Sequence, residues 1–209
     1  MRQLVASALC ATVFALAGCY PESGVSSTAQ LSTATTFYDK KYDFGSARTY
    51  AMPDSVVHIT EGAPDTVSHQ YDQVILNTIA SEMNAAGYSR VDNTDADDPD
   101  LVVLPAAMGT TNIVWWNYPW CDYWGWYWPG YCPGWTPGYP GWTTGYSYQT
   151  GTVLILMVNR KGKDDISQTL PAVWLGAING VIENPTNTSQ GIVAGIQQLF
   201  TQSPYLKAK

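Results

Sequence analysis

The chain has 209 residues, enough for one domain with a sizeable core, and 45% of them are hydrophobic. Its net charge of -7 provides no basic surface for phosphate groups, so the composition argues against a nucleic-acid partner. Only 13% of the residues are charged, about half the usual share. The 9 Trp and 14 Tyr against 4 Phe are the feature that needs a local explanation.

Residues 1–18 have the pattern of a secretory signal peptide. Arg2 precedes an apolar run from 4 to 17, which is shorter than the about 20 residues that a permanent membrane helix needs. The tetrapeptide LAGC that ends at Cys19 resembles the lipobox of bacterial lipoproteins. We therefore expect cleavage before Cys19, lipidation of its thiol and attachment to a membrane through that lipid. Tyr20 stands where an Asp would favour inner-membrane retention, which favours the outer membrane.

Residues 19–33 are small and polar after the cysteine, so they predict a lipidated Cys19 followed by a flexible tether. Residues 34–209 then form a single domain. Its first part mixes aromatic and polar residues in a pattern that fits short strands around Gly45. A helix is predicted over about 66–86, with Asp65 as its N-cap and Gly87 just past its end. Its apolar side chains recur at helical spacing: Val67, Tyr71, Val74, Ile75, Ile79, Met83 and Ala86.

The second half of the chain predicts further strands and a final helix. A short strand is expected over 88–91, an acidic turn over 93–99 and a buried strand over 101–108. Strands over 151–158 and 171–178 flank a charged, glycine-containing turn, as in a hairpin. The last helix starts at Asn187 or Thr188, ends before Pro204, and presents an apolar stripe of Ile192, Val193, Ile196, Leu199 and Phe200.

Together these elements predict an α+β fold: a mostly antiparallel sheet, two amphipathic helices on one of its faces, and a long aromatic loop inserted at 111–148. Several short motifs resemble, in their order, the lipoprotein family of domain of unknown function 4136 (DUF4136): YDF at 42–44, NAAGY at 84–88, DPDLVV at 98–103 and VWLG at 173–176. The resemblance spans about 38–205 and implies a signal peptide, a lipid anchor and one α+β domain. It supplies no catalytic residues, and Leu175 stands where the family pattern has an arginine.

The inserted loop, residues 111–148, is called the aromatic insert below. From 115 to 148 it holds eight of the 9 Trp and a single charge, Asp122. Four Pro-Gly pairs between 129 and 141 predict turns and not regular helix. Cys121 and Cys132 are an even pair in an exported protein, which favours a disulfide over two free thiols or an intermolecular bridge. The ninth tryptophan, Trp174, is expected in the core.

Exposed Trp and Tyr side chains suit three kinds of contact: a protein interface, a membrane surface and a glycan on which the rings stack. A fourth interpretation is structural, with the rings packed on one another and on the sheet. If the insert is a contact surface, its leading candidates are Trp115, Trp116, Trp120, Trp124, Trp126 and Trp128. The preferred function is a non-catalytic interaction or structural role in the envelope. The alternatives are a peptidoglycan-binding module and an unrecognised hydrolase.

Few residues point to catalysis or metal binding. Asp92, Asp95, Asp97, Asp98 and Asp100 lack the glycine and late glutamate of a calcium loop, so a solvated acidic turn is favoured. His69 and Asp72 lie one helical turn apart, and a metal or acid/base pair is conceivable there. A solvent-facing His69 on the polar helix face is the preferred interpretation. Because no hydrolase, phosphate-binding or metalloprotease motif occurs, we expect no enzyme activity, no cofactor and no metal site.

Overall fold

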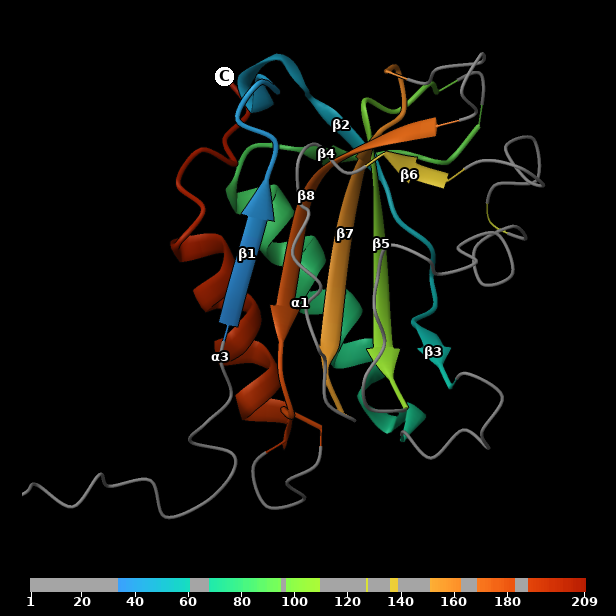
Figure 1. The fold of residues 1–209 in the computed structure, drawn as a ribbon, viewed down its shortest axis with the longest axis vertical. Coiled ribbons are helices and arrows are strands. Elements are labelled where there is room, and N and C mark those ends of the chain that lie inside the picture. Colours follow the sequence, from blue (N-terminus) through green and yellow to red (C-terminus); the bar gives the residue numbers. More distant parts are fainter. Residues whose placement is uncertain are drawn as a thin grey trace, which may run out of the picture.

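The computed structural model describes residues 34–60, 68–94, 97–109, 127, 136–138, 151–162, 169–182 and 188–209. These residues form one mixed sheet with two helices packed against the same face (Figure 1). The strand order is β1 (Ala34–Tyr38), β8 (Thr169–Ile178), β7 (Val153–Asn159), β5 (Leu101–Met108), β2 (Thr49–Ala51) and β4 (Ser89–Arg90). Outside that path, β3 (Val57–Ile59) pairs with β5 and β6 (Thr136–Gly138) pairs with β8. The α+β class expected from the sequence is therefore confirmed.

The antiparallel part of the sheet contains its longest strands. β1 (Ala34–Tyr38) pairs with β8 (Thr169–Ile178), which pairs with β7 (Val153–Asn159), which pairs with β5 (Leu101–Met108). The hairpin predicted from the charged turn is β7–β8, and the apolar run over 101–108 is a buried strand with the predicted bounds. Local sequence pattern was sufficient for these strands because apolar runs bounded by turn residues mark them.

The remaining strands pair in parallel, so the expectation of a mostly antiparallel sheet is wrong. β2 (Thr49–Ala51) lies parallel to both β5 and β4 (Ser89–Arg90), and β3 (Val57–Ile59), which the sequence did not predict, lies parallel to β5. A helix lies between β3 and β4 in the chain, and such a crossover brings the next strand back in the same direction. β6 (Thr136–Gly138), within the aromatic insert, also pairs in parallel, with β8.

The first helix begins later than predicted. Ser68 caps a short 3-10 helix, η3 (His69–Tyr71), through a hydrogen bond that its side chain accepts from the Gln70 amide. α1 (Asp72–Ala85) follows directly. Residues 69–71 were predicted to be α-helical, but they form the 3-10 helix instead. The proposed cap at Asp65 lies outside the described residues. Gly87 has a φ of +93° just past the helix end, as predicted for a glycine at that position.

Both helices bury their apolar side chains against one face of the sheet. α3 (Thr188–Thr201) ends before Pro204 as expected and lies beside α1 (Figure 1). The core between helices and sheet includes Ile75, Ile79 and Met83 of α1, Ile192, Ile196 and Leu199 of α3, and Val103, Ile155, Met157 and Trp174 of the strands. Within the described part of the chain, no helix has the length and apolar character that a membrane crossing requires.

Candidate functional site

The face of the sheet opposite the helices is apolar and buried. Alternate side chains of β5, β7 and β8 form this second face: Val102, Leu104, Ala106, Met108, Leu154, Leu156, Val158, Ala172, Leu175 and Ala177. None of these side chains is more than 6% exposed. A sheet that is apolar on both faces has to be covered on both, which explains why residues 101–108 are continuously apolar instead of alternating.

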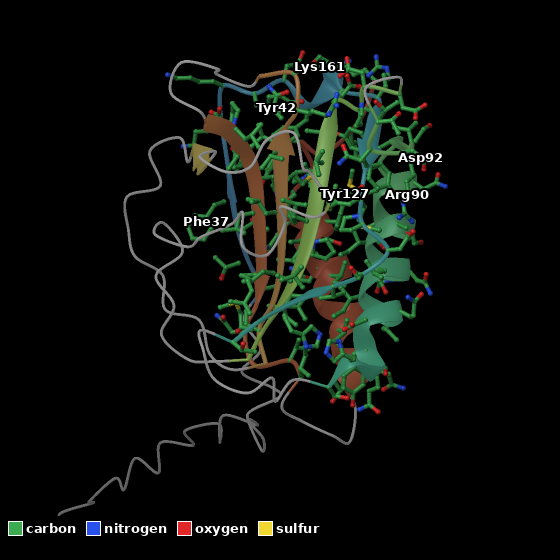
Figure 2. All side chains as sticks on the ribbon, turned by 90° about the vertical axis from the view of Figure 1, so that its right-hand side faces the viewer. Phe37, Tyr42, Arg90, Asp92, Tyr127 and Lys161 are labelled. Atoms are coloured by element: carbon green, nitrogen blue, oxygen red, sulfur yellow. The ribbon has the colours of Figure 1, made fainter. Side chains whose placement is uncertain are left out.

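Tyr127 is a described residue of the aromatic insert, and it packs against this second face. Asn93, which follows β4, donates a hydrogen bond from Nδ2 to the Tyr127 carbonyl over 2.9 Å. Burial raises the pKa of the Tyr127 hydroxyl to about 12, with the Arg90 charge opposing the rise and Asp54 and Asp92 adding to it. Figure 2 shows Tyr127 close to Arg90 and Asp92, on the side of the sheet where the strands pair in parallel. The insert is therefore attached to the domain at residue 127.

Strand β6 is a second attachment of the aromatic insert. Thr136, Pro137 and Gly138 pair with the first residues of β8, Thr169 to Pro171. Proline removes one backbone donor, so Pro137 suits a short strand at the margin of a sheet. The described residues of the insert thus meet the domain next to β4 and at the start of β8.

Most of the site residues expected from the sequence lie outside the described residues. These are Cys19, the pair Cys121 and Cys132, and the tryptophans 115, 116, 120, 124, 126 and 128. Lipidation, the disulfide and the tryptophan contact surface therefore stay predictions. Trp174 is fully buried, as expected. The sequence analysis did not single out Tyr127, because nothing in the local pattern separates one ring of this segment from its neighbours.

The acidic turn is partly solvated and partly paired with cations. Asp92 and Asp97 are exposed, in agreement with the prediction. Asp98, however, forms an ion pair with the buried Arg160, and Asp100 accepts a hydrogen bond of 2.5 Å from Lys161 Nζ. These pairs were not predicted, because the two cations follow β7, about 60 residues further along the chain.

Asp100 also joins two parallel strands. Its Oδ2 accepts hydrogen bonds from the backbone amides of Arg48 at 2.7 Å and Thr49 at 3.0 Å, at the start of β2. Burial opposes ionisation of this carboxyl group, but the hydrogen bonds from Lys161, Arg48 and Thr49 outweigh it and lower its pKa from 3.8 to about 2. The carboxylate of the DPDLVV motif is therefore a structural link between β2 and β5.

Both histidines of the chain meet at one carboxylate. His58 of β3 places Nε2 3.0 Å from Asp72 Oδ1, and His69 of η3 places Nδ1 3.0 Å from Asp72 Oδ2. The two imidazole rings are stacked, with centroids 3.7 Å apart and an interplanar angle of 8°. His69 is 66% exposed, so it faces solvent as expected, and it also contacts Asp72, the pairing named as the alternative from the sequence. His58 was missed because its strand was not predicted.

The comparisons with known proteins concern the whole domain. Residues 34–205 match the family model described as Domain of unknown function (DUF4136). The chain is similar to the crystal structure of a DUF4136 family protein from Bacteroides thetaiotaomicron, with 27% identity, a TM-score of 0.66 and coverage of 85% of this chain and 98% of that one.

Two dodecameric structures of PelC from Paraburkholderia phytofirmans are 12% identical, with TM-scores of 0.40 and coverage of 84% of this chain and 99% of theirs. No curated protein matches the chain. The motif resemblance found in the sequence is confirmed by the family match, which spans every strand and helix described above. This chain belongs to the DUF4136 family.

Proposed function

We propose that this chain is a non-catalytic lipoprotein of the bacterial cell envelope, held at the outer membrane by a lipid on Cys19, and that its aromatic insert is the contact surface for an envelope partner protein. The observation that carries this proposal is the attachment of the insert at Tyr127 and β6. Both attachments lie inside the insert, within the stretch of the chain that carries the Trp and Tyr residues.

Attachment favours binding because it lowers the cost of ordering. A contact segment that is already held in place loses less conformational freedom when a partner binds. Trp and Tyr are the residue types most enriched among the anchors that dominate protein interfaces. The insert is rich in Trp and Tyr, and it is attached to the domain at Tyr127 and β6.

The proposed anchor also places the domain near the membrane. From Cys19 to the first residue of β1, Ala34, a fully extended tether spans about 50 Å. The domain can therefore reach partners at the membrane surface or within the adjacent cell-wall layer. Attachment through the N-terminus lets the domain turn its aromatic insert toward a partner.

The test uses the full lipidated chain and a triple variant, Trp120→Ala with Trp124→Ala and Trp128→Ala. The native chain should capture a partner protein from envelope extract, and the triple variant should lose that partner while its melting temperature stays close to the native value. Tyr20→Ala, an aromatic-to-alanine change in the tether, is the matched control and should retain capture. Undiminished capture by the triple variant would contradict the proposal. A tryptophan fluorescence change with peptidoglycan fragments, in place of protein capture, would favour the glycan alternative.

Tyr127 supplies a separate prediction about the insert. Tyr127→Ala should lower the free energy of unfolding by about 1–2 kcal/mol, because the half-buried ring packs on the second sheet face. Tyr127→Phe keeps that ring and should cost less. Urea unfolding followed by circular dichroism measures both. If Tyr127→Ala unfolds at the same urea concentration as the native chain, the insert is not held to the sheet by this residue.

A further inference from the structure

The three-residue group of His58, His69 and Asp72 brings together side chains from separate elements. His58 comes from β3, which pairs with β5 in the register His58 to Ala107. His69 comes from η3, which Ser68 caps, and Asp72 is the first residue of α1. Each element fixes the backbone of one side chain, so the group is part of the fold and does not depend on the aromatic insert.

The donor atoms are close enough to share one ion. Each imidazole nitrogen lies 3.0 Å from an Asp72 oxygen, and the three donor atoms all lie within 4.8 Å of one another. Bonds of about 2.0–2.1 Å around a tetrahedral ion require donors about 3.3 Å apart. The two nitrogen–oxygen distances are close to this value, and they involve different oxygens of the Asp72 carboxylate, Oδ1 for His58 and Oδ2 for His69. A rotation of the His69 ring can bring the two nitrogens together, because that side chain is 66% exposed.

Burial divides the group into a fixed part and an adjustable part. The His58 side chain is 4% exposed and the Asp72 side chain 18%, so the domain holds both. The His69 side chain is 66% exposed, so an ion in solution can reach this member of the group. A metal site needs access from solvent as well as suitable ligands.

We propose that His58, His69 and Asp72 bind one divalent transition-metal ion, with Zn²⁺ as the ion of choice and water at the open position. Imidazole nitrogen favours Zn²⁺, Cu²⁺ and Ni²⁺, whereas Ca²⁺ and Mg²⁺ prefer sites made of oxygen atoms alone. Two imidazoles and one carboxylate leave room for a fourth, exchangeable ligand.

The ion would tie β3 to the start of α1. β3 is a three-residue strand that pairs with β5 only at residues 57–59. A metal bridge from His58 to Asp72 would strengthen the existing contact between this strand and the start of α1. Because ions that bind only the folded state stabilise it, Zn²⁺ should raise the melting temperature of the domain.

The experiment titrates the full lipidated chain, purified without a histidine tag, with Zn²⁺ by calorimetry and follows the melting temperature in parallel. We expect one Zn²⁺ per chain and a rise in melting temperature that depends on the Zn²⁺ concentration. His69→Gln should weaken binding by about tenfold or more and abolish most of the thermal shift. Because His69 is exposed, the metal-free melting temperature of this variant should stay near the native value.

Three further measurements separate this group from other ligands. Asp72→Asn should weaken binding as His69→Gln does, whereas Asp92→Asn, in the acidic turn, should bind Zn²⁺ as the native chain does. The Co²⁺-loaded chain should show the absorption of nitrogen and oxygen ligands. A thiolate charge-transfer band, unchanged affinity in His69→Gln, or no stoichiometric binding would each overturn the proposal. These outcomes leave the aromatic-insert proposal unaffected, since partner capture does not involve this group.

Discussion

Replacing Trp174 with alanine should lower the free energy of unfolding by about 3–5 kcal/mol, the range for large aromatic side chains removed from a core. The indole is fully buried between β8 and α3, with its ring centroid 5.7 Å from that of Phe200. Its Nε1 donates to Ser203 Oγ at 3.0 Å, and Ser203 is also buried. The change therefore removes packing and a buried hydrogen bond together.

Trp174→Phe is the matched control for packing without the indole donor. It should cost less than half as much as the alanine variant, because Ser203 Oγ keeps its 3.1 Å contact with the Tyr205 hydroxyl. Urea unfolding followed by circular dichroism is the suitable measurement, since eight other tryptophans would obscure fluorescence. A loss below about 1 kcal/mol for Trp174→Ala would show that this side of the core repacks around the missing ring.

Gly176 makes the same region sensitive to added atoms. A Cβ at this position would lie 2.5 Å from Trp174 Cη2 and 2.8 Å from Leu199 Cδ1. Gly176→Ala should therefore cost about 1–3 kcal/mol in the native background. In the Trp174→Phe background the cost should fall, because the smaller ring lacks Cη2, and a double-mutant cycle measures the difference. Equal costs in both backgrounds would contradict this packing.

Asp100→Asn should lower the free energy of unfolding by about 2 kcal/mol at neutral pH. The variant loses the charge that accepts hydrogen bonds from the Arg48 and Thr49 amides and from Lys161. These bonds hold the start of β2 beside β5, where Tyr50 pairs with Leu101. Lys161→Met is the matched control. It removes only a half-exposed cation and should cost less than about 1 kcal/mol.

The Asp100 effect should depend on pH in a defined direction. Its folded-state pKa of about 2 lies below the ordinary value of 3.8, so the carboxylate stabilises the fold above about pH 4. That contribution declines as the pH falls toward 2, where the group becomes protonated in the folded state too. The stability difference between the native chain and Asp100→Asn should shrink over this interval. A difference that stays constant from neutral pH to pH 2 would contradict the assigned pKa.

Sequence pattern was most informative where contacts are local. The turn between β7 and β8, the glycine that ends α1 and the apolar stripe of α3 each lie within a few residues of the element they define. The same holds for β5, whose unbroken apolar run predicted a buried strand. The predicted direction of strand pairing was wrong for β2 and β3, because both strands are short and their neighbour β5 lies more than 40 residues away in the sequence.

The candidate sites depended on the fold to a greater degree. His58 and Asp72 are 14 residues apart, and Asp100 and Lys161 are 61 residues apart. A periodic sequence pattern does not show which residues meet across such separations. His69 was predicted on a polar helix face, and only the structure places it beside both of the other candidate metal ligands. The contact of Tyr127 with the second sheet face was likewise visible only in the tertiary structure.

By itself the sequence determined the family, the α+β class and the concentration of aromatic residues in one insert. It also predicted a signal peptide and a lipidation site before residue 34. These features are read from neighbouring residues or from motif order along the chain. The tertiary structure alone decided the mixed sheet, the second buried face, the Asp100 link and the meeting of His58 with His69. Each of these features depends on the α1 crossover and on the pairing of β5, β7 and β8. Both bring together side chains that lie far apart in the sequence.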